Sequence, residues 1–113
     1  MAKREIVMSP VARDALIVLG QQIRIARTQR RWTLNDLATR ALISVPTLRA
    51  IEDGAPGTAV GTVFHVADLA GVPIFGIDDR AELARRRRQG EDILALLPER
   101  VRTPPAGEAR DDF

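Results

Sequence analysis

The chain contains two consecutive helical segments that are too short to be stable on their own, and this feature constrains its fold most. Thr33 precedes the segment "LNDLATRAL", with Asp36 three residues on, which is the arrangement of an N-cap followed by a reciprocal cap. Ser44 begins the second segment, Pro46 stands in its first turn, and Gly54 ends it. Isolated helices of fewer than about 12 residues are marginal in water. Both segments must therefore pack against a third element.

A longer helix that can provide this support is predicted from about Arg13 to Arg31. Gly20 is the only Gly or Pro in it, and its apolar residues recur at spacings of three and four, namely Leu16, Leu19, Ile23 and Ala26. If both short helices pack on it, the outer side of the second one, residues 45–52, is left free. This is the helix-turn-helix arrangement.

A fourth helix is predicted after the loop that follows Gly54. Thr58 is its expected N-cap, and its apolar residues at helical spacing are Val60, Val63, Phe64 and Ala67. It ends near Gly71, because Pro73 prevents its extension. The stretch "RAELARRRRQGEDILALL" then predicts a fifth helical region, interrupted near Gly90. Since strand-like alternation never extends beyond a few residues, the predicted fold class is all-α.

The composition limits the kind of site that the chain can carry. Cysteine is absent, which excludes disulfides and thiolate zinc sites and favours the cytoplasm. The start "MAKREIVMSP" does not have the pattern of a secretory signal. The most apolar window contains Asp68, His65, three glycines and a proline, which argue against a membrane span. Enzyme signatures are missing, so we expect no catalysis, cofactor or bound metal. A polyanionic partner is favoured by the arginines of residues 20–53, which are Arg24, Arg27, Arg30, Arg31, Arg40 and Arg49.

The stretch "LGQQIRIARTQRRWTLNDLATRALISVPTLRAIEDG" resembles the XRE (Cro/C1-type) helix-turn-helix family. The matching features are "IRxAR", the Thr33 cap, "DLA", the "SVPTL" start of the third helix and "IE-x-G" at its end. The resemblance implies a compact five-helix domain of phage-repressor type with a C-terminal extension. The expected organisation is an N-terminal arm (residues 1–12), the DNA-binding domain (13–78), a charged helical extension (79–97) and a flexible tail (98–113).

The resemblance implies that the second short helix, the recognition helix, lies in the major groove of double-stranded DNA. The residues implied to contact DNA are Arg24, Thr33, Ser44, Val45, Pro46, Thr47, Arg49 and Ala50. Hydroxyls at helix starts can bind phosphate, whereas Arg49 either contacts guanine or binds phosphate. The apolar residues cannot hydrogen-bond base edges, but they can pack against thymine methyls. Direct readout should therefore be sparse, with specificity resting also on DNA shape and half-site spacing.

The resemblance also implies a partly buried ion pair between Arg27 and Glu52, which would hold the first helix to the end of the recognition helix. The alternative is that both are ordinary surface charges. Two residues depart from the family pattern. Leu34 stands where a glutamine usually contacts the DNA backbone, and Leu42 stands where the turn commonly has glycine. Leu42 must therefore accept a conformation that glycine takes easily.

The function implied by the resemblance is a sequence-specific transcriptional repressor that acts as a homodimer in the cytoplasm, on the nucleoid. Within the family, "IRIARTQRRWTLNDLA", "APGTAVGTVFHVADLAGV" and "LPERVR" resemble HipB-like antitoxin regulators, which bind their own operator and a HipA-like serine/threonine kinase toxin. The alternative is a protein-interaction module that neutralises such a partner with little DNA binding. Leu34, Val45 and Pro46 favour the module, whereas the arginine distribution favours DNA.

The remaining expectations concern residues outside the recognition helix. Dimerisation is predicted through the fourth helix and the region after Pro73, using Phe64, Ile74, Phe75 and Ile77. Trp32 is expected to pack in the core, and His65 to be an ordinary core or surface histidine, because it lacks companion metal ligands. Four consecutive arginines at 85–88 wrap most of the way round a helix, so a solvated segment and a site for phosphate or an acidic partner are equally open.

Overall fold

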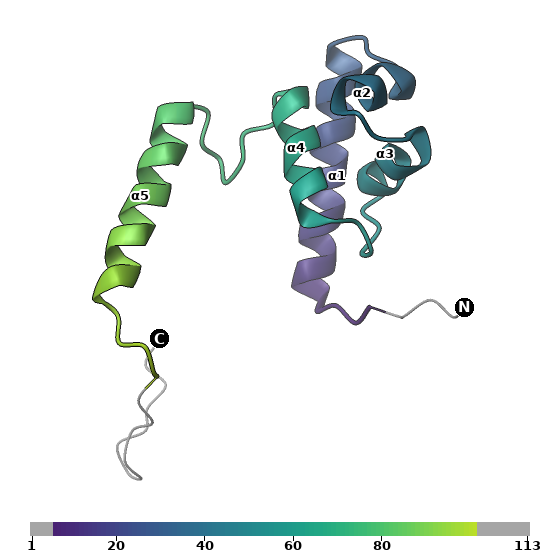
Figure 1. Cartoon of the computed structure of the whole chain (residues 1–113). Coiled ribbons are helices and arrows are strands. Elements are labelled where there is room, and N and C mark those ends of the chain that lie inside the picture. The colour runs from purple at the N-terminus through teal and green to yellow at the C-terminus, as the bar shows by residue number, and fades with distance from the viewer. Residues whose placement is uncertain (1–5, 102–113) are drawn as a thin grey trace. The chain divides into compact units, whose positions relative to one another are not determined.

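The computed structural model describes residues 6–101 of the chain, and these residues contain five helices (Figure 1). The helices are α1 (Pro10–Gln29), α2 (Leu34–Ala41), α3 (Val45–Glu52), α4 (Val60–Ala70) and α5 (Arg80–Leu96). Contacts divide the chain into two units, residues 1–78 and 79–113, so α1 to α4 share one unit and α5 belongs to the other. No strand occurs within residues 6–101, which confirms the all-α class.

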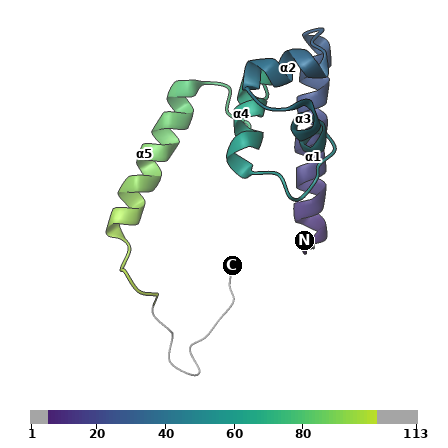
Figure 2. The ribbon, with the colours of Figure 1, turned by 45° about the vertical axis from the view of Figure 1, so that its right-hand side comes forward.

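The core of the first unit lies between the four helices, with α3 against α1 and α4 against both α1 and α2 (Figure 2). The largest fully buried side chains come from every one of these helices and are Ile23, Leu37, Leu48, Ile51 and Val66. The expectation that both short helices pack on α1 holds for α3. For α2, the main partners are α3 and α4. Helix α3 is thus held from one side by the longest helix of the unit.

The first helix begins earlier than the sequence predicted. Ser9 is its N-cap, with the Ser9 hydroxyl accepting a hydrogen bond from the N–H of Ala12 at 3.1 Å, and Pro10 occupies the first turn. A proline tolerates this position because the N–H that it lacks would have no helical acceptor. Residues 10–12 therefore belong to α1 and not to the arm. Residues 1–5 of the expected arm lie outside the described residues.

The boundaries of α2 and α3 follow from the predicted capping residues. The hydroxyl of Thr33 accepts from the N–H of Asp36 at 3.0 Å, and the carboxylate of Asp36 accepts from the N–H of Thr33 at 2.8 Å, which completes a capping box. At the end of α2, Leu42 adopts the left-handed conformation with φ 59° and is 91% exposed. The predicted strain at Leu42 is therefore present in the turn between the two helices.

The capping box makes one contribution to stability dependent on pH. The pKa of Asp36 is lowered from its ordinary value, first by the hydrogen bond from the backbone N–H of Thr33 and second by the hydroxyl of the same residue. A carboxyl group with a lowered folded-state pKa contributes stability that is present above its ordinary pKa and lost as the pH falls through the folded-state pKa.

We therefore expect Asp36→Asn to remove part of the loss of thermal stability that the wild type shows on acidification below the ordinary range of aspartate. Unfolding midpoints measured across an acid pH series test this expectation. Asp14→Asn, at an exposed position of α1, serves as the matched control. Wild type and Asp36→Asn losing stability in parallel would contradict the role of the carboxylate.

Two further boundaries differ from the sequence prediction. Thr58 does not cap α4, because its hydroxyl donates to the carbonyl of Ala55 at 3.1 Å and the N-cap position falls on Ala59, which has no side-chain acceptor. In the second unit, α5 runs through Gly90 without interruption. A glycine inside a helix costs about 1 kcal/mol relative to alanine, and ion pairs one helical turn apart in α5 help to offset that cost.

A tight turn closes the first unit after α4. The N–H of Ile77 donates to the carbonyl of Ile74 at 3.0 Å, and the two residues form an isolated antiparallel bridge. Both central residues have positive φ, 56° at Phe75 and 71° at Gly76. This is the backbone of a type I′ turn, in which Phe75 holds a conformation that asparagine or glycine adopts more easily.

The second unit is described only up to Val101. None of the residues of α5 is buried. Most of the expected flexible tail, residues 102–113, lies outside the described residues. No helix among the described residues is both long enough and apolar enough to span a membrane.

Candidate nucleic-acid interface

The recognition helix α3 presents one face to the core and the opposite face to solvent. Leu48 and Ile51 are fully buried, while Pro46, Thr47 and Arg49 are exposed. This division follows from the helical repeat, since residues three apart share a face. Val45 and Ala50 lie at the boundary and are half-buried, and Val45 also packs against the core. Five of the residues implied to contact DNA lie on α3, and of these three are therefore exposed and two are half-buried.

Hydroxyl groups gather at the start of α3. Ser44 is the N-cap, and its hydroxyl accepts from the N–H of Thr47 at 3.2 Å. The same oxygen lies 2.8 Å from the hydroxyl of Thr47. Both residues are exposed. Hydroxyl groups and N–H groups at a helix start are donors that suit a phosphate oxygen, so this end of α3 can position a DNA backbone.

Arg27 and Glu52 form a bidentate ion pair between α1 and the end of α3. The Nε of Arg27 lies 2.7 Å from one carboxylate oxygen of Glu52, and its Nη2 lies 3.0 Å from the other. The third nitrogen, Nη1, donates to the carbonyl of Trp32 at 2.9 Å. The side chains are only 12% and 4% exposed, so these are not ordinary surface charges. The hydrogen bond to Glu52 is the main reason that the pKa of Arg27 is raised above its ordinary value.

Two glycines allow α1 to approach the end of α3 this closely. A Cβ atom on Gly20 would lie 2.6 Å from the carbonyl oxygens of both Ile51 and Glu52. Gly54, which follows α3 with φ 73°, has the backbone of Ile17 at a similar distance, since a Cβ there would lie 2.9 Å from its Cα. The ion pair and these backbone contacts act at the same end of α3, and together they fix the helix from behind.

Arg24 and Arg49 lie near this ion pair. Together with Leu34, they line a hollow of about 290 Å³ that also includes the pair itself and Asp53. Both arginines are exposed. The structure thus brings together two of the predicted DNA-contacting cations, one from α1 and one from α3. Arg49 belongs to α3, whose outer face is exposed, whereas Arg24 belongs to α1.

The start of α2 supplies one polar residue and one apolar residue to the same side. Thr33 is exposed, but its hydroxyl is already engaged as the cap of α2. Leu34 is half-buried and packs against the core cluster. Leu34, at the position where the family usually has a glutamine, therefore contributes to packing. It offers no polar contact to a DNA backbone.

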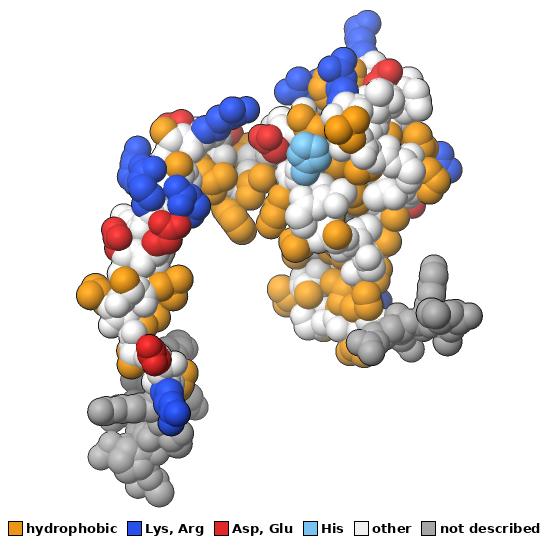
Figure 3. All heavy atoms as spheres, viewed as in Figure 1, with side chains coloured by type: hydrophobic (Ala, Val, Ile, Leu, Met, Phe, Trp, Pro, Cys, Tyr) orange, Lys and Arg blue, Asp and Glu red, His pale blue; other side chains and the backbone are white. Residues whose placement is uncertain are grey.

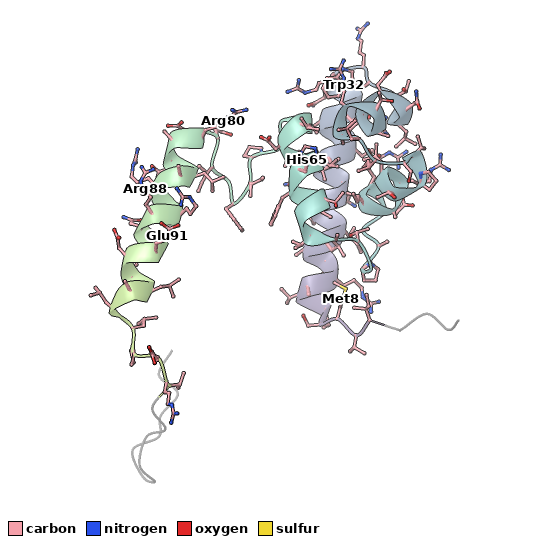
Figure 4. The ribbon with its side chains drawn as sticks, in the orientation of Figure 1. Met8, Trp32, His65, Arg80, Arg88 and Glu91 are labelled. Atoms are coloured by element: carbon pink, nitrogen blue, oxygen red, sulfur yellow. The ribbon has the colours of Figure 1, made fainter. Side chains whose placement is uncertain are left out.

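Trp32 packs partly against the core, as expected, and two arginines cover its ring. The guanidinium carbon of Arg40 lies 4.3 Å from the ring centroid and that of Arg30 lies 5.1 Å from it. The Nε of Arg30 also donates to the carbonyl of Ala70 at 3.0 Å, at the end of α4. Figure 4 labels Trp32 at one end of the first unit, and Figure 3 shows Lys and Arg side chains gathered over this end.

The roles of these arginines show how the basic sequence segment is used. Arg27 and Arg30 join α1 to α3 and α4, and Arg40 stacks on Trp32. Sequence reasoning missed the stacking, because Arg30 follows the end of α1, Trp32 precedes α2, Arg40 belongs to α2, and no local motif joins them. Fewer arginines are therefore free for a polyanion than the composition indicated.

The residues predicted to form a dimer interface lie on α4 and in the turn that follows it. The rings of Phe64 and Phe75 have centroids 5.8 Å apart and are tilted by 59°. Phe75 is 78% exposed, whereas Phe64, Ile74 and Ile77 are half-buried. The structure therefore joins the two aromatic residues into one apolar patch with one strongly exposed member.

Neither His65 nor the arginine run has the geometry of a specialised site. His65 is exposed on α4 (Figure 4), and the described residues contain no group of three metal-ligating side chains. In α5, Arg85 and Arg86 pair with Glu82, and Arg87 pairs with Glu91 at 2.7 Å. Three of the four consecutive arginines are thus engaged within their own helix, which favours a solvated segment.

Comparison with known proteins adds one finding to this geometry. A family model described as a helix-turn-helix domain matches residues 18–83, which is more than half of the 113-residue chain. No curated protein and no solved structure showed significant similarity to the chain.

Proposed function

This chain belongs to the helix-turn-helix domain family, and on that premise we propose that it is a transcriptional regulator that places α3 in the major groove of double-stranded DNA. The observation that supports this most is the position of α3. Its inner face and its C-terminal end are held by α1, and its outer face presents Pro46, Thr47 and Arg49 to solvent. A helix fixed from behind and exposed in front is suited to enter a groove as a rigid body.

The exposed face of α3 predicts how such a regulator would read DNA. Arg49 is its one cationic side chain and can form two hydrogen bonds to a guanine. Pro46 and the exposed part of Ala50 offer apolar contact to thymine methyls. Ser44 and Thr47 offer hydroxyls to the backbone. The proposed readout is thus one polar base contact supported by shape and methyl contacts.

Arg49→Ala is expected to lower the affinity for a selected DNA duplex by about 5- to 150-fold, which corresponds to the roughly 1–3 kcal/mol of discrimination in one bidentate base contact. The duplex is obtained by selecting from a random-sequence pool with the full chain, and affinities are measured by gel shift at one fixed salt concentration. Arg13→Ala removes an exposed arginine at the start of α1 and is the matched control. Equal losses in the two variants would contradict a role of Arg49 in base recognition.

We also propose that the protein acts as a repressor in the form of a homodimer. One recognition helix makes few phosphate contacts, so two copies on half-sites about 34 Å apart would be needed for useful affinity. The patch of Phe64 and Phe75, continued by Ile74 and Ile77, is the proposed interface. The exposure of Phe75 supports this, because a large aromatic side chain at the centre of an interface often dominates its energy.

Phe75→Asn tests the proposed interface without disturbing the turn that contains Phe75. Asparagine followed by Gly76 suits a type I′ turn, so the variant should fold at least as well as the wild type. Its dimer dissociation constant should rise by about tenfold or more, because the aromatic contact is lost. Sedimentation measures this.

Leu42→Asn is the matched control for that variant, since Leu42 is also exposed and also has positive φ. A dimer weakened equally by both variants, or a wild type that is monomeric at micromolar concentration, would contradict the proposed interface.

Within this function, we propose a HipB-like antitoxin role, in which the protein binds its own operator and a HipA-like kinase toxin. The rival proposal is an interaction module with little sequence-specific DNA binding. Leu34, Val45 and Pro46 favour the module, whereas Arg24 and Arg49 beside the ion pair favour DNA. A DNA-binding measurement distinguishes the two proposals, because the module would bind every duplex weakly and without sequence preference.

A further inference from the structure

An open hollow of about 750 Å³ lies beside the recognition helix and is not explained by DNA contact alone. Its walls come from four parts of the first unit. These are Ile6, the side of α3 that carries Pro46, Thr47, Ala50 and Ile51, the loop at residues 55–59, and Thr62 of α4. Figures 1 and 2 show this loop as it leaves α3 and leads to the start of α4. The volume falls within the range of about 300–1,000 Å³ that is typical of small-molecule sites.

The chemistry of the walls indicates what the hollow can hold. None of its lining residues is charged, and most are apolar. A phosphate backbone would gain no ion pair from such walls, and a charged ligand would lose its hydration without compensation. Hydroxyl groups come from Thr47, Thr58 and Thr62, and that of Thr58 is held by its hydrogen bond to the carbonyl of Ala55. The fitting ligand is neutral and largely apolar, with a hydroxyl or carbonyl oxygen.

We propose that this hollow binds a small neutral, largely apolar molecule, and that the bound molecule excludes DNA from α3. The exclusion follows from shared residues, because Pro46, Thr47 and Ala50 line the hollow and also belong to the proposed groove-facing side of α3. The regulatory part of this inference rests on the proposed function. The binding part depends only on the hollow.

Gly57 offers a way to fill the hollow without disturbing the backbone. A Cβ atom there would meet only the Cδ1 of Ile6, at 3.9 Å, which is ordinary contact. Gly57→Leu therefore places a large apolar side chain in the space. Gly61→Leu makes the same change on α4, where a Cβ has no atom within 4 Å and the residue does not line the hollow. Ala55→Leu fills the hollow from a second position, in case Gly57→Leu fails to fold.

The binding test uses the neutral fluorophore N-phenyl-1-naphthylamine with the full chain in the absence of DNA. We expect saturable binding of one probe per chain, weakened at least tenfold by Gly57→Leu or Ala55→Leu and unchanged within twofold by Gly61→Leu. Equal binding by the filled variants, or no saturable binding by the full chain, would overturn the proposal.

The regulatory test adds the selected DNA duplex. We expect the probe to weaken DNA binding of the wild type and of Gly61→Leu at least tenfold, and not to change the DNA binding that Gly57→Leu retains. Simultaneous binding of probe and duplex, with no mutual effect, would overturn the exclusion. If no duplex binds the chain at all, the proposed function fails, while probe binding still decides whether the hollow is a ligand site.

Discussion

Arg27→Ala is expected to destabilise the first unit by about 3–5 kcal/mol, which is the usual cost of removing one partner of a buried ion pair. The side chain of Glu52, which is only 4% exposed, would lose its bidentate partner. The substitution would also remove the hydrogen bond to the carbonyl of Trp32. Since whole domains are stable by only about 5–15 kcal/mol, a loss of this size would unfold much of the protein at moderate temperature.

Removing Arg27 and Glu52 together should cost less than Arg27→Ala alone, because the double variant has no unpaired buried charge. Urea unfolding of the two single variants and the double variant measures the coupling, and the single tryptophan, Trp32, reports on the first unit. Strictly additive losses would show that the two side chains do not depend on each other, and the account of how α3 is held would then be wrong.

Gly20→Ala is expected to destabilise the same unit by about 1–3 kcal/mol or more, although it adds only one methyl group. That methyl would lie 2.6 Å from the carbonyl oxygens of Ile51 and Glu52, both of which are backbone atoms. Backbone cannot move aside as the end of a flexible side chain can, so α1 would have to shift away from α3. The shift would also lengthen the ion pair between Arg27 and Glu52.

Gly61→Ala is the matched control for this experiment, because it makes the same change in a helix at a position with no atom within 4 Å of the new Cβ. Alanine is favoured over glycine in helices, so this variant should be as stable as the wild type or slightly more stable. Urea unfolding midpoints compare the two variants. A Gly20→Ala variant with wild-type stability would show that the close approach of α1 to α3 is not required.

Much of the fold could be predicted because local chemistry decides it. Thr33 and Asp36 define the start of α2, Ser44 and Pro46 define the start of α3, and the position of Leu42 requires a left-handed turn. In each case the determining contacts are within about four residues. The predicted helix boundaries were wrong where a more distant contact, or a choice between neighbouring capping residues, determined where a helix begins or ends.

Particular residues illustrate those errors. Ser9 was placed in the arm because the first helix was expected to begin at about Arg13, yet its hydroxyl caps the helix. Thr58 has a hydroxyl that could cap a helix, but this hydroxyl donates to the carbonyl of Ala55 in the same loop. Gly90 was read as a break, although ion pairs one helical turn apart, such as Arg87 with Glu91, help to stabilise the helix around it.

Part of the candidate site could likewise be predicted from the sequence, and part could not. The positions of Arg27, Glu52 and the exposed residues of α3 came from a resemblance, and the structure supplies distances for the pair that the sequence alone could not. The stacking of Arg40 on Trp32 and the hollow lined by Ile6, Ala50 and Thr62 were not predicted. The hollow joins residues that are far apart in the chain, and Arg40 meets Trp32 only once α2 has formed, so no local motif predicts either feature.

The most direct test of the central claim, that α3 and its flanking arginines bind double-stranded DNA, is the salt dependence of binding by the full chain to a selected duplex. The account predicts that log K falls linearly with log salt with a slope of about −3 or steeper, since each neutralised phosphate contributes roughly −0.9. Failure to select any preferred duplex, together with a slope near zero, would contradict it.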